Sequence, residues 1–446
     1  MISRRNTSMP EYRKIAGYQA PVYVVDGART PFLKARSGPG AFTAADLAAA
    51  AGRPLLARLA SMVSAESFDH VILGNVMAGP SEANIARVAS LRLGFGKGVP
   101  AFTVHRNCAS GMQAVDSAAL EISTGRADLI LAGGTEAMSH APVLWSPQMA
   151  GWLGELYKAS GAGKAEAISK LRPSMLKPVI GLLQGLTDPI VGLNMGQTAE
   201  ELAHRFGITR QQMDQFAMES HMGLARAQDE KRLVEIAPVF DSRGNAYEAD
   251  DGVRRDSSME SLARLKPAFD KPFGAVTAGN SAQITDGAAW LALASERAVE
   301  KYRLPVLAAI RHTRWAGVPP ELMGLGPANA MALLLADMEM GSEKIGWWEI
   351  NEAFAAQVLA VMKAFADPGY VLEETGVAQS FAPIPRDKLN EAGGAICVGH
   401  PVGASGARII LRLIHTLHKN NSQFGVASLC IGGGQGGAML VERVTA

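Results

Sequence analysis

The chain has 446 residues, of which 48% are hydrophobic and 19% charged, and its formal net charge is +1. This composition is typical of a globular protein of two or three domains, and the balanced, interspersed charge gives no nucleic-acid-binding footprint. Three scattered cysteines exclude a disulfide framework and a C-x-x-C metal site. We therefore expect reduced thiols, a cytoplasmic location and no metal site.

The N-terminal residues 1–19 lack the apolar core of a secretory signal, so we expect a loose arm. No apolar run is long enough to span a bilayer. Strand and helix patterns then alternate up to residue 141. Strands are expected over 20–32, 69–77, 100–107 and 127–137, and helices over 43–60, 84–95 and 109–123. Apolar β-branched runs between helices favour βαβ units and a parallel sheet covered on both faces.

The C-terminal part repeats this plan. Strands are expected over 305–312, 345–351, 424–433 and 436–444, and helices over 327–338, 352–365 and 403–419. Both halves carry the tripeptide Ala-Ser-Gly at a strand-to-helix junction, at 109–111 and 404–406. The shared tripeptide and the matching order of elements favour a duplicated α/β unit.

The region between the halves is irregular and mostly helical, which suggests an insertion that caps the α/β core. Residues 275–295 return to the core pattern and supply the last strand of the first half. The predicted organisation is an N-terminal arm (1–19), a first half (20–141 and 275–300), an inserted domain (142–274) and a second half (301–446).

Cys108 is predicted to begin a helix, where free backbone N–H groups stabilise a thiolate. The alternative is an inert buried cysteine. His400 follows the end of a predicted strand, in a loop with Pro401, and is either a base for a thiol proton or a structural loop histidine. His105 is a rival base, but an offset of three residues on an extended strand turns it away from Cys108.

Cys430 ends an apolar strand and precedes "IGGGQGG", whose glycines permit a tight turn with backbone N–H groups open to a small anion. The glycine spacing is not G-x-G-x-x-G and a strand follows, which excludes a dinucleotide fingerprint. Cys397 is expected to pack in the core. Asn351, at a strand end in "INEAFAAQ", is either a helix cap or an amide that orients a water or an oxyanion.

Several motifs occur in the order found in one family. They are "DGARTPF", "NCASGMQAV", "AGGTEAMS", "GLNMGQTAEELA", "RLKPAFD", "TAGNSAQITDGAA", "MGLGPANA", "NEAFAAQ", "GGAICVGHPVGASGAR" and "CIGGGQGGAM". From about residue 20 to its end, the chain resembles the thiolases, which comprise acetyl-CoA acetyltransferases and 3-ketoacyl-CoA thiolases. The resemblance implies a five-layered αβαβα fold with two similar βαβαβαββ halves and an inserted loop domain that holds coenzyme A.

The resemblance also implies an activity: thiolysis of 3-ketoacyl-CoA to acyl-CoA and acetyl-CoA, the reverse of a Claisen condensation, through an acyl group on Cys108. His400 would activate Cys108, and Cys430 would move the proton at the α carbon. Asn351, through a water, and His400 would form one oxyanion hole, and the backbone N–H groups of Cys108 and Gly432 the other. Coenzyme A would be a substrate, with no bound cofactor. Substrate contacts implied by alignment are Met195, Arg254, Ser261, Ala278, Ser281, Ala282, Met323 and Phe354.

Thiolases are dimers or tetramers, and some join a multifunctional partner, so we expect a homodimer, a homotetramer or such a complex. The segment 144–191 is longer and more apolar than in short-chain members, as in fatty-acid oxidation β-subunits. We expect it to contact a partner subunit, a membrane or an acyl chain, or else to pack on its own core. Alternative functions are acetoacetyl-CoA synthesis and a non-catalytic lipid-binding subunit. A β-ketoacyl synthase is disfavoured because Cys430 stands where that enzyme needs a second histidine.

Overall fold

The computed structural model describes residues 10–444 and divides them between one large sheet, two small hairpins and surrounding helices. The strands of the large sheet are β1 Val22–Arg29, β2 Leu33–Lys34, β3 His70–Gly74, β4 Ala101–Val104, β5 Leu129–Ala137, β10 Thr285–Ser295, β11 Ala308–Gly317, β12 Ile345–Ile350, β13 Phe424–Ile431 and β14 Gln435–Arg443. The helices of the two halves are α1 Ala44–Leu59, α2 Ile85–Arg92, α3 Ser110–Ser123, α10 Glu296–Tyr302, α11 Gly326–Asp337, α12 Ala355–Phe365, α13 Pro368–Thr375, α14 Ala395–Val398 and α15 Val402–Lys419. No helix between residues 10 and 444 combines the length and apolar content needed to cross a membrane.

The large sheet has the strand order β12-β13-β14-β11-β1-β10-β5-β3-β4, with β2 beside β10. The two halves join where β1 pairs antiparallel with β11. The prediction of a parallel sheet is wrong for most pairs, because only β12–β13, β3–β4 and β3–β5 run parallel. The last two strands of the second half, β13 and β14, form a direct hairpin, and such a short connection requires antiparallel strands.

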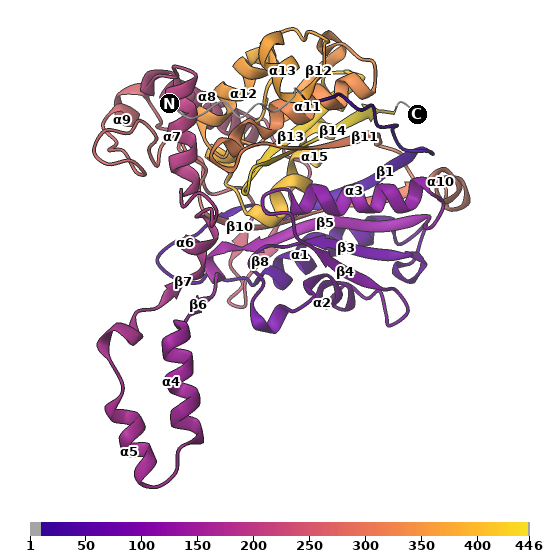
Figure 1. Ribbon diagram of the computed structural model, residues 1–446. Coiled ribbons are helices and arrows are strands. Elements are labelled where there is room, and N and C mark those ends of the chain that lie inside the picture. The colour runs from indigo at the N-terminus through magenta and orange to yellow at the C-terminus, as the bar shows by residue number, and fades with distance from the viewer. Residues whose placement is uncertain (1–9, 445–446) are drawn as a thin grey trace.

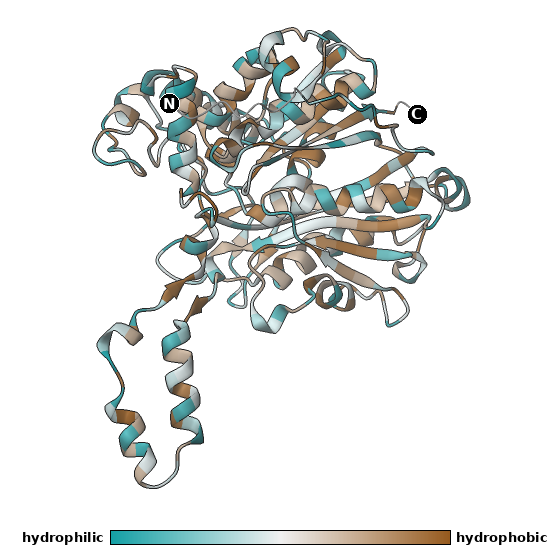
Figure 2. Cartoon of the chain, in the orientation of Figure 1, coloured by the Kyte–Doolittle hydropathy of each residue, from teal (hydrophilic) through white to brown (hydrophobic). Residues whose placement is uncertain are grey.

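Five layers are visible in Figure 1, with helices above, between and below the two halves of the sheet. Helices α1 and α2 cover the outer face of the first half, and α11 and α12 cover that of the second half. Helices α3 and α15 lie between the halves in one apolar core that includes side chains from both, such as Ile72, Leu291, Leu429 and Met439. This arrangement confirms the predicted αβαβα fold, and the brown strands of Figure 2 show how apolar the layers are.

The central layer depends on the glycines of the two Ala-Ser-Gly motifs. A Cβ atom on Gly111 of α3 would lie 2.9 Å from the backbone N of Ala407 in α15. A Cβ on Gly406 of α15 would lie 2.4 Å from the backbone N of Met112 in α3. Each helix therefore lets the backbone of the other approach through its own motif glycine, which gives the sequence repeat a structural reason.

The two halves are less alike than predicted. The first half follows the order βαβαβαββ, but the third strand of the second half is reduced to a single bridge between Trp348 and Leu389. Pro383 and Pro385 precede that bridge and lack the N–H groups of a strand ladder, and Asn390 after it has a positive φ of 50°. The next segment is the short helix α14, so His400 follows a helix and not the expected strand.

The described part of the N-terminal arm is fixed to the second half, which corrects the prediction of a loose arm. The Tyr12 hydroxyl and the Ile15 backbone N–H both donate to Asp337 of α11, at 2.9 and 3.0 Å. The Tyr18 hydroxyl donates to Asp116 of α3 at 2.7 Å. Residues 1–9 lie outside the described part.

The inserted region contributes both a cap and a projecting hairpin. Its elements are β6 Val143–Leu144, α4 Pro147–Lys158, α5 Ala162–Ser169, β7 Val179–Ile180, α6 Gly181–Gly185, α7 Met195–Arg205, α8 Arg210–Asp229, β8 Val239–Phe240, β9 Ala246–Tyr247 and α9 Met259–Ala263. Helices α7 and α8 pack on α11 and α12 of the second half. The segment from β6 to β7, with α4 and α5, projects away from the body (Figure 1).

Candidate active site

The turn between β13 and β14 holds Cys430 and Gly432. Cys430 is the penultimate residue of β13, pairs with Gly436 of β14, and is 1% exposed. Residues 432–434 make the turn, and the positive φ angles of Gly433 and Gly434, 89° and 81°, are conformations that glycine adopts without strain. The predicted glycine turn therefore exists, and it places Gly432 two residues beyond Cys430.

Cys108 lies two residues before the start of α3, in a loop fixed by its neighbours. Asn107 has a positive φ of 43°, and its side-chain amide donates to the Gly432 carbonyl at 2.7 Å. The Ser110 hydroxyl accepts the Arg106 N–H and donates to the Asn107 carbonyl. These bonds tie the Cys108 loop directly to the turn after Cys430, although the two are more than 300 residues apart in sequence.

The predicted stabilisation of a Cys108 thiolate is only partly correct. Burial raises the pKa of Cys108 to about 11, while the backbone N–H groups of Gly432 and of Cys108 itself lower it. The helix-start geometry thus favours an anion, but the loss of water outweighs it. The resting group is a thiol that needs a base. The two N–H groups that face its sulfur are the pair expected to hold an oxyanion.

His400 presents an unprotonated ring nitrogen that can accept a proton. Its Nδ1 lies 2.7 Å from the Ser405 hydroxyl, which donates to the Pro401 carbonyl at 3.1 Å. Because that hydroxyl hydrogen is already engaged, Nδ1 carries the imidazole proton and Nε2 keeps its lone pair. Burial, together with the charge of Arg408, lowers the pKa of His400 to about 4, so the ring is neutral at pH 7. His105 is exposed and lies outside the cavity described below.

Asn351 directly follows β12 and faces His400. Its Nδ2 lies 3.4 Å from His400 Nε2, and its Oδ1 is buried without a hydrogen-bond partner. The cap of α12 is Phe354, three residues later, so Asn351 is not a helix cap. The next residue, Glu352, also precedes α12, and its carboxylate is fully buried. An unsatisfied amide oxygen beside a base fits an amide that orients a water.

A cavity of about 380 Å³ collects most of the predicted residues. Its lining includes Cys108, His400, Cys430, Gly432, Met195, Ser281, Ala282, Met323 and Phe354. The 281–282 segment reaches it by pairing with the start of α12, where Ser281 and Phe354 form a bridge. Burial and the proximity of Cys108 raise the pKa of Cys430 well above its usual value, so Cys430 is also a protonated thiol at rest. Cys397, as expected, is fully buried and does not line this cavity.

Three predicted substrate contacts lie elsewhere. Arg254, Ser261 and Ala278 are on the exposed surface outside this cavity, and their role as coenzyme A contacts stays a prediction.

The structure also places residues in the site that the sequence analysis did not single out. Phe269 lines the cavity and packs edge-on against Phe354, with ring centroids 5.8 Å apart. Its position in the quoted motif "RLKPAFD" was the available signal. Asn107 is likewise part of a quoted motif, "NCASGMQAV", but that motif gives no sign of its bond to the Gly432 carbonyl.

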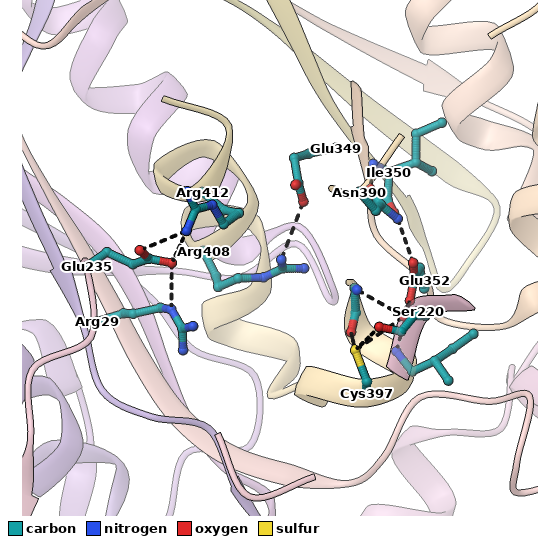
Figure 3. A network of polar contacts seen from close by, with 12 residues as sticks. Arg29, Ser220, Glu235, Glu349, Ile350, Glu352, Asn390, Cys397, Arg408 and Arg412 are labelled. Carbon is teal, nitrogen blue, oxygen red and sulfur yellow. Dashed lines mark hydrogen bonds and ion pairs between the residues drawn. The ribbon is translucent and has the colours of Figure 1, made fainter. Parts of the chain in front are cut away.

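Figure 3 shows buried polar contacts in which Glu352 lies between Asn390 and Ser220. Its carboxylate accepts from the Ser220 hydroxyl of α8 at 2.6 Å and from the Asn390 amide at 2.8 Å. It also accepts the Ile396 N–H of α14 at 3.3 Å. Glu352 therefore connects the Asn351 turn to the helix that leads into His400, and we infer that it is a positioning residue for both.

Replacing Glu352 with Ala is expected to lower the free energy of unfolding by about 2–4 kcal/mol, because buried donors of Ser220 and Asn390 lose their acceptor. Urea denaturation measures this, with Glu373→Ala on the exposed face of α13 as a control expected within about 0.5 kcal/mol of wild type. In the folded variant kcat is expected to fall while KM changes little, since Asn351 and His400 shift. Unchanged kcat would contradict the positioning role.

Comparison with known proteins agrees with this fold. Residues 22–297 match the family model described as "Thiolase, N-terminal domain", and residues 304–443 match "Thiolase, C-terminal domain". The chain belongs to the thiolase family, and it is an acyltransferase that acts on acyl-CoA and coenzyme A. The predicted resemblance is confirmed.

Three named proteins show how similar the chain is to known members of the family. The chain is 35% identical to the mitochondrial trifunctional enzyme subunit beta of Bos taurus, over 99% of this chain and 90% of that protein. It is 37% identical to the beta-ketoadipyl-CoA thiolase of Pseudomonas knackmussii, over 95% and 99%. The crystal structure of human mitochondrial 3-ketoacyl-CoA thiolase in complex with CoA superposes with a TM-score of 0.83 at 34% identity, covering 97% of this chain and 100% of that chain.

Proposed function

We propose that the chain cleaves 3-ketoacyl-CoA with coenzyme A by a ping-pong mechanism through an acyl-Cys108 intermediate. The observation that carries the proposal is the convergence of Cys108, His400 and Cys430 on one cavity. One thiol and one base would explain acyl transfer alone. A second thiol in the same cavity supplies the acid–base group that carbon–carbon chemistry at the α carbon needs.

In the first half-reaction, His400 Nε2 takes the proton of Cys108, and the sulfur attacks the keto carbon. The bond between that carbon and the α carbon breaks, and Cys430 protonates the α carbon to release acetyl-CoA. The thioester oxygen carries negative charge in this step, and His400 and a water on Asn351 stabilise it. The raised pKa of Cys430 suits this exchange, because its thiolate is a strong enough base to remove an α proton in the reverse direction.

In the second half-reaction, Cys430 takes the proton of the incoming coenzyme A thiol, whose sulfur attacks the acyl group on Cys108. The oxyanion of that intermediate is held by the N–H groups of Cys108 and Gly432. The intermediate collapses to acyl-CoA, and Cys108 recovers its proton from His400. Two separate oxyanion sites are needed because charge develops on the acyl oxygen when either thiol attacks the acyl carbon, and on the thioester oxygen of acetyl-CoA when the carbon–carbon bond breaks.

The direct test is thiolysis of acetoacetyl-CoA and longer 3-ketoacyl-CoA esters by the purified protein, followed by the loss of absorbance of the keto ester. Turnover of any of them supports the proposal. A protein that binds coenzyme A esters but cleaves none would be a non-catalytic lipid-binding subunit. Acetoacetyl-CoA synthesis from two molecules of acetyl-CoA is the same chemistry in reverse.

We further propose that the chain works as a homo-oligomer. We also propose that it works in a reducing, cytoplasm-type compartment, which its three free thiols favour.

The projecting hairpin is proposed to contact a membrane with anionic headgroups. Met149 and Ala167 are buried between its helices, but most of its apolar side chains are exposed, with Trp145 at 50%, Tyr157 at 92% and Ile168 at 57%. It carries five basic side chains, Lys158, Lys164, Lys170, Arg172 and Lys177, and two acidic ones, Glu155 and Glu166.

Replacing residues 147–177 with a short Gly-Ser linker is expected to abolish sedimentation with vesicles that contain phosphatidylserine, because the exposed apolar and basic side chains are lost. Wild-type protein should sediment with those vesicles and not with phosphatidylcholine alone. Acetoacetyl-CoA thiolysis, measured in parallel, should be equal in both proteins. If the wild type sediments with neither kind of vesicle, and a multifunctional partner copurifies only when the hairpin is present, then the hairpin binds a partner subunit instead of a membrane.

A further inference from the structure

A second cavity, of about 210 Å³, also reaches Cys108. It shares Cys108, Leu186, Thr187, Met195, Val402 and Gly432 with the first cavity. The side chains found only in the second cavity include Val76, Met77, Pro189 and Ile190. His400 and Cys430 line the first cavity and not the second. The two cavities therefore meet at the nucleophile but differ in chemistry.

We propose that the second cavity holds the acyl chain carried by Cys108, and that the chain it selects is uncharged and at least of medium length. This inference rests on the thiolase function proposed above. An acyl group on the Cys108 sulfur must extend away from His400 and Cys430, since the thiol of coenzyme A needs that side. The second cavity is the apolar space on the other side, and burial of each methylene there strengthens binding about fourfold.

The cavity leads to a surface that can take longer chains. Ile190, at its rim, is 81% exposed, and Gly185 brings the end of α6 into its lining. Helix α6 joins directly to β7, where Ile180 is 39% exposed, and β6 and β7 are among the most hydrophobic exposed strands in Figure 2. A chain too long for the cavity would continue along these side chains instead of meeting a closed wall.

The polar groups of this cavity indicate which chain ends fit. Asn107 is bonded to the Gly432 carbonyl, and the Thr187 hydroxyl donates to the Leu183 carbonyl at 3.0 Å. Asp188 is 2% exposed and accepts the N–H groups of Ile190 and Val191 on Oδ1, while its Oδ2 has no hydrogen-bond partner. A carboxylate at the end of an acyl chain would meet this buried acid, and the like charges would repel each other.

The test uses the full-length protein and compares thiolysis of 3-ketoacyl-CoA esters of four, six, ten and sixteen carbons with that of 3-oxoadipyl-CoA. The last has the same six carbons as 3-oxohexanoyl-CoA, with a terminal carboxylate in place of the methyl group. Wild-type kcat/KM should rise with chain length, and 3-oxohexanoyl-CoA should exceed 3-oxoadipyl-CoA by about tenfold or more. The Asp188→Asn variant keeps the Oδ1 acceptor of the turn and should narrow that ratio.

Two further variants test whether the acyl chain occupies the second cavity and its exposed rim. Met77→Trp fills the cavity and Ile190→Asp charges its exposed rim, and each should lower the kcat/KM ratio of the ten-carbon to the four-carbon ester by about tenfold. Val234→Ser, at a side chain that is 71% exposed and outside both cavities, is the matched control and should leave the ratio unchanged. If Met77→Trp and Ile190→Asp both leave the ratio unchanged, or if the wild type prefers 3-oxoadipyl-CoA, the inference is overturned. Failure to cleave any ester would instead reject the thiolase function itself.

Discussion

The Cys108→Ala protein should bind acetyl-CoA but neither form an acyl-enzyme nor cleave acetoacetyl-CoA, with thiolysis reduced by about 10⁴-fold or more. The reason is that no other thiol can take its place. Cys430 lies in the same cavity, but the N–H groups of Cys108 and Gly432 face the Cys108 sulfur. Single-turnover assays with labelled acetyl-CoA would measure acylation, and steady-state assays would measure thiolysis.

The Cys397→Ala protein is the matched control, because it removes a buried thiol that does not line the cavity. It should acylate and cleave substrate at close to the wild-type rate. A Cys397→Ala protein that fails to acylate, beside a Cys108→Ala protein that still does, would show that the nucleophile has been wrongly assigned.

The Cys430→Ala protein should still acylate Cys108, because His400 and both N–H groups beside Cys108 remain, and because the departing coenzyme A thiolate, unlike a carbanion, can leave without a proton from Cys430. Condensation and thiolysis should fall by about 10²–10⁴-fold, which is the usual contribution of a general acid–base group. Proton exchange isolates the step. In D₂O, wild-type enzyme should exchange the methyl hydrogens of acetyl-CoA for deuterium, and Cys430→Ala should exchange almost none.

Two other outcomes of that experiment are informative. If Cys430→Ala blocks acylation and spares exchange, the two cysteines have each other's roles. If both reactions fail, the loss of a buried side chain has disturbed the site, and Cys430→Ser, which is closer in size, should restore acylation without restoring exchange.

The sequence predicts two similar α/β halves because its repeat has a physical cause, whereas the five-layered arrangement was implied by the family resemblance. Gly111 and Gly406 let α3 and α15 approach each other, and both glycines are in the Ala-Ser-Gly motif that marks the two halves. Strand direction is not predicted, because an apolar run has the same pattern in a parallel or an antiparallel pair. Pro383 and Pro385 were a local sign that the third strand of the second half is lost. The prediction followed the resemblance instead, which implies two similar halves.

The candidate site is predicted where chemistry depends on residue type and missed where it depends on tertiary contact. A cysteine before a helix and a cysteine before a glycine turn are visible as motifs. The role of Asn107 follows from its bond to the Gly432 carbonyl, and that of Ser405 from its contact with His400, both of which require the folded chain. The pKa of Cys108 was wrongly expected to fall because burial, which raises it, has no local sequence signal.

The most direct test of the mechanism is to identify the acylated residue in the unmodified protein. The enzyme is incubated with acetyl-CoA, quenched in acid, digested and analysed by peptide mass spectrometry. We expect a single acetyl thioester on the peptide that contains Cys108, with Cys397 and Cys430 free, and its loss on addition of coenzyme A. An acetyl group on Cys397 or Cys430 with Cys108 free, or no acetyl group on any cysteine while acetoacetyl-CoA is being cleaved, would contradict the mechanism.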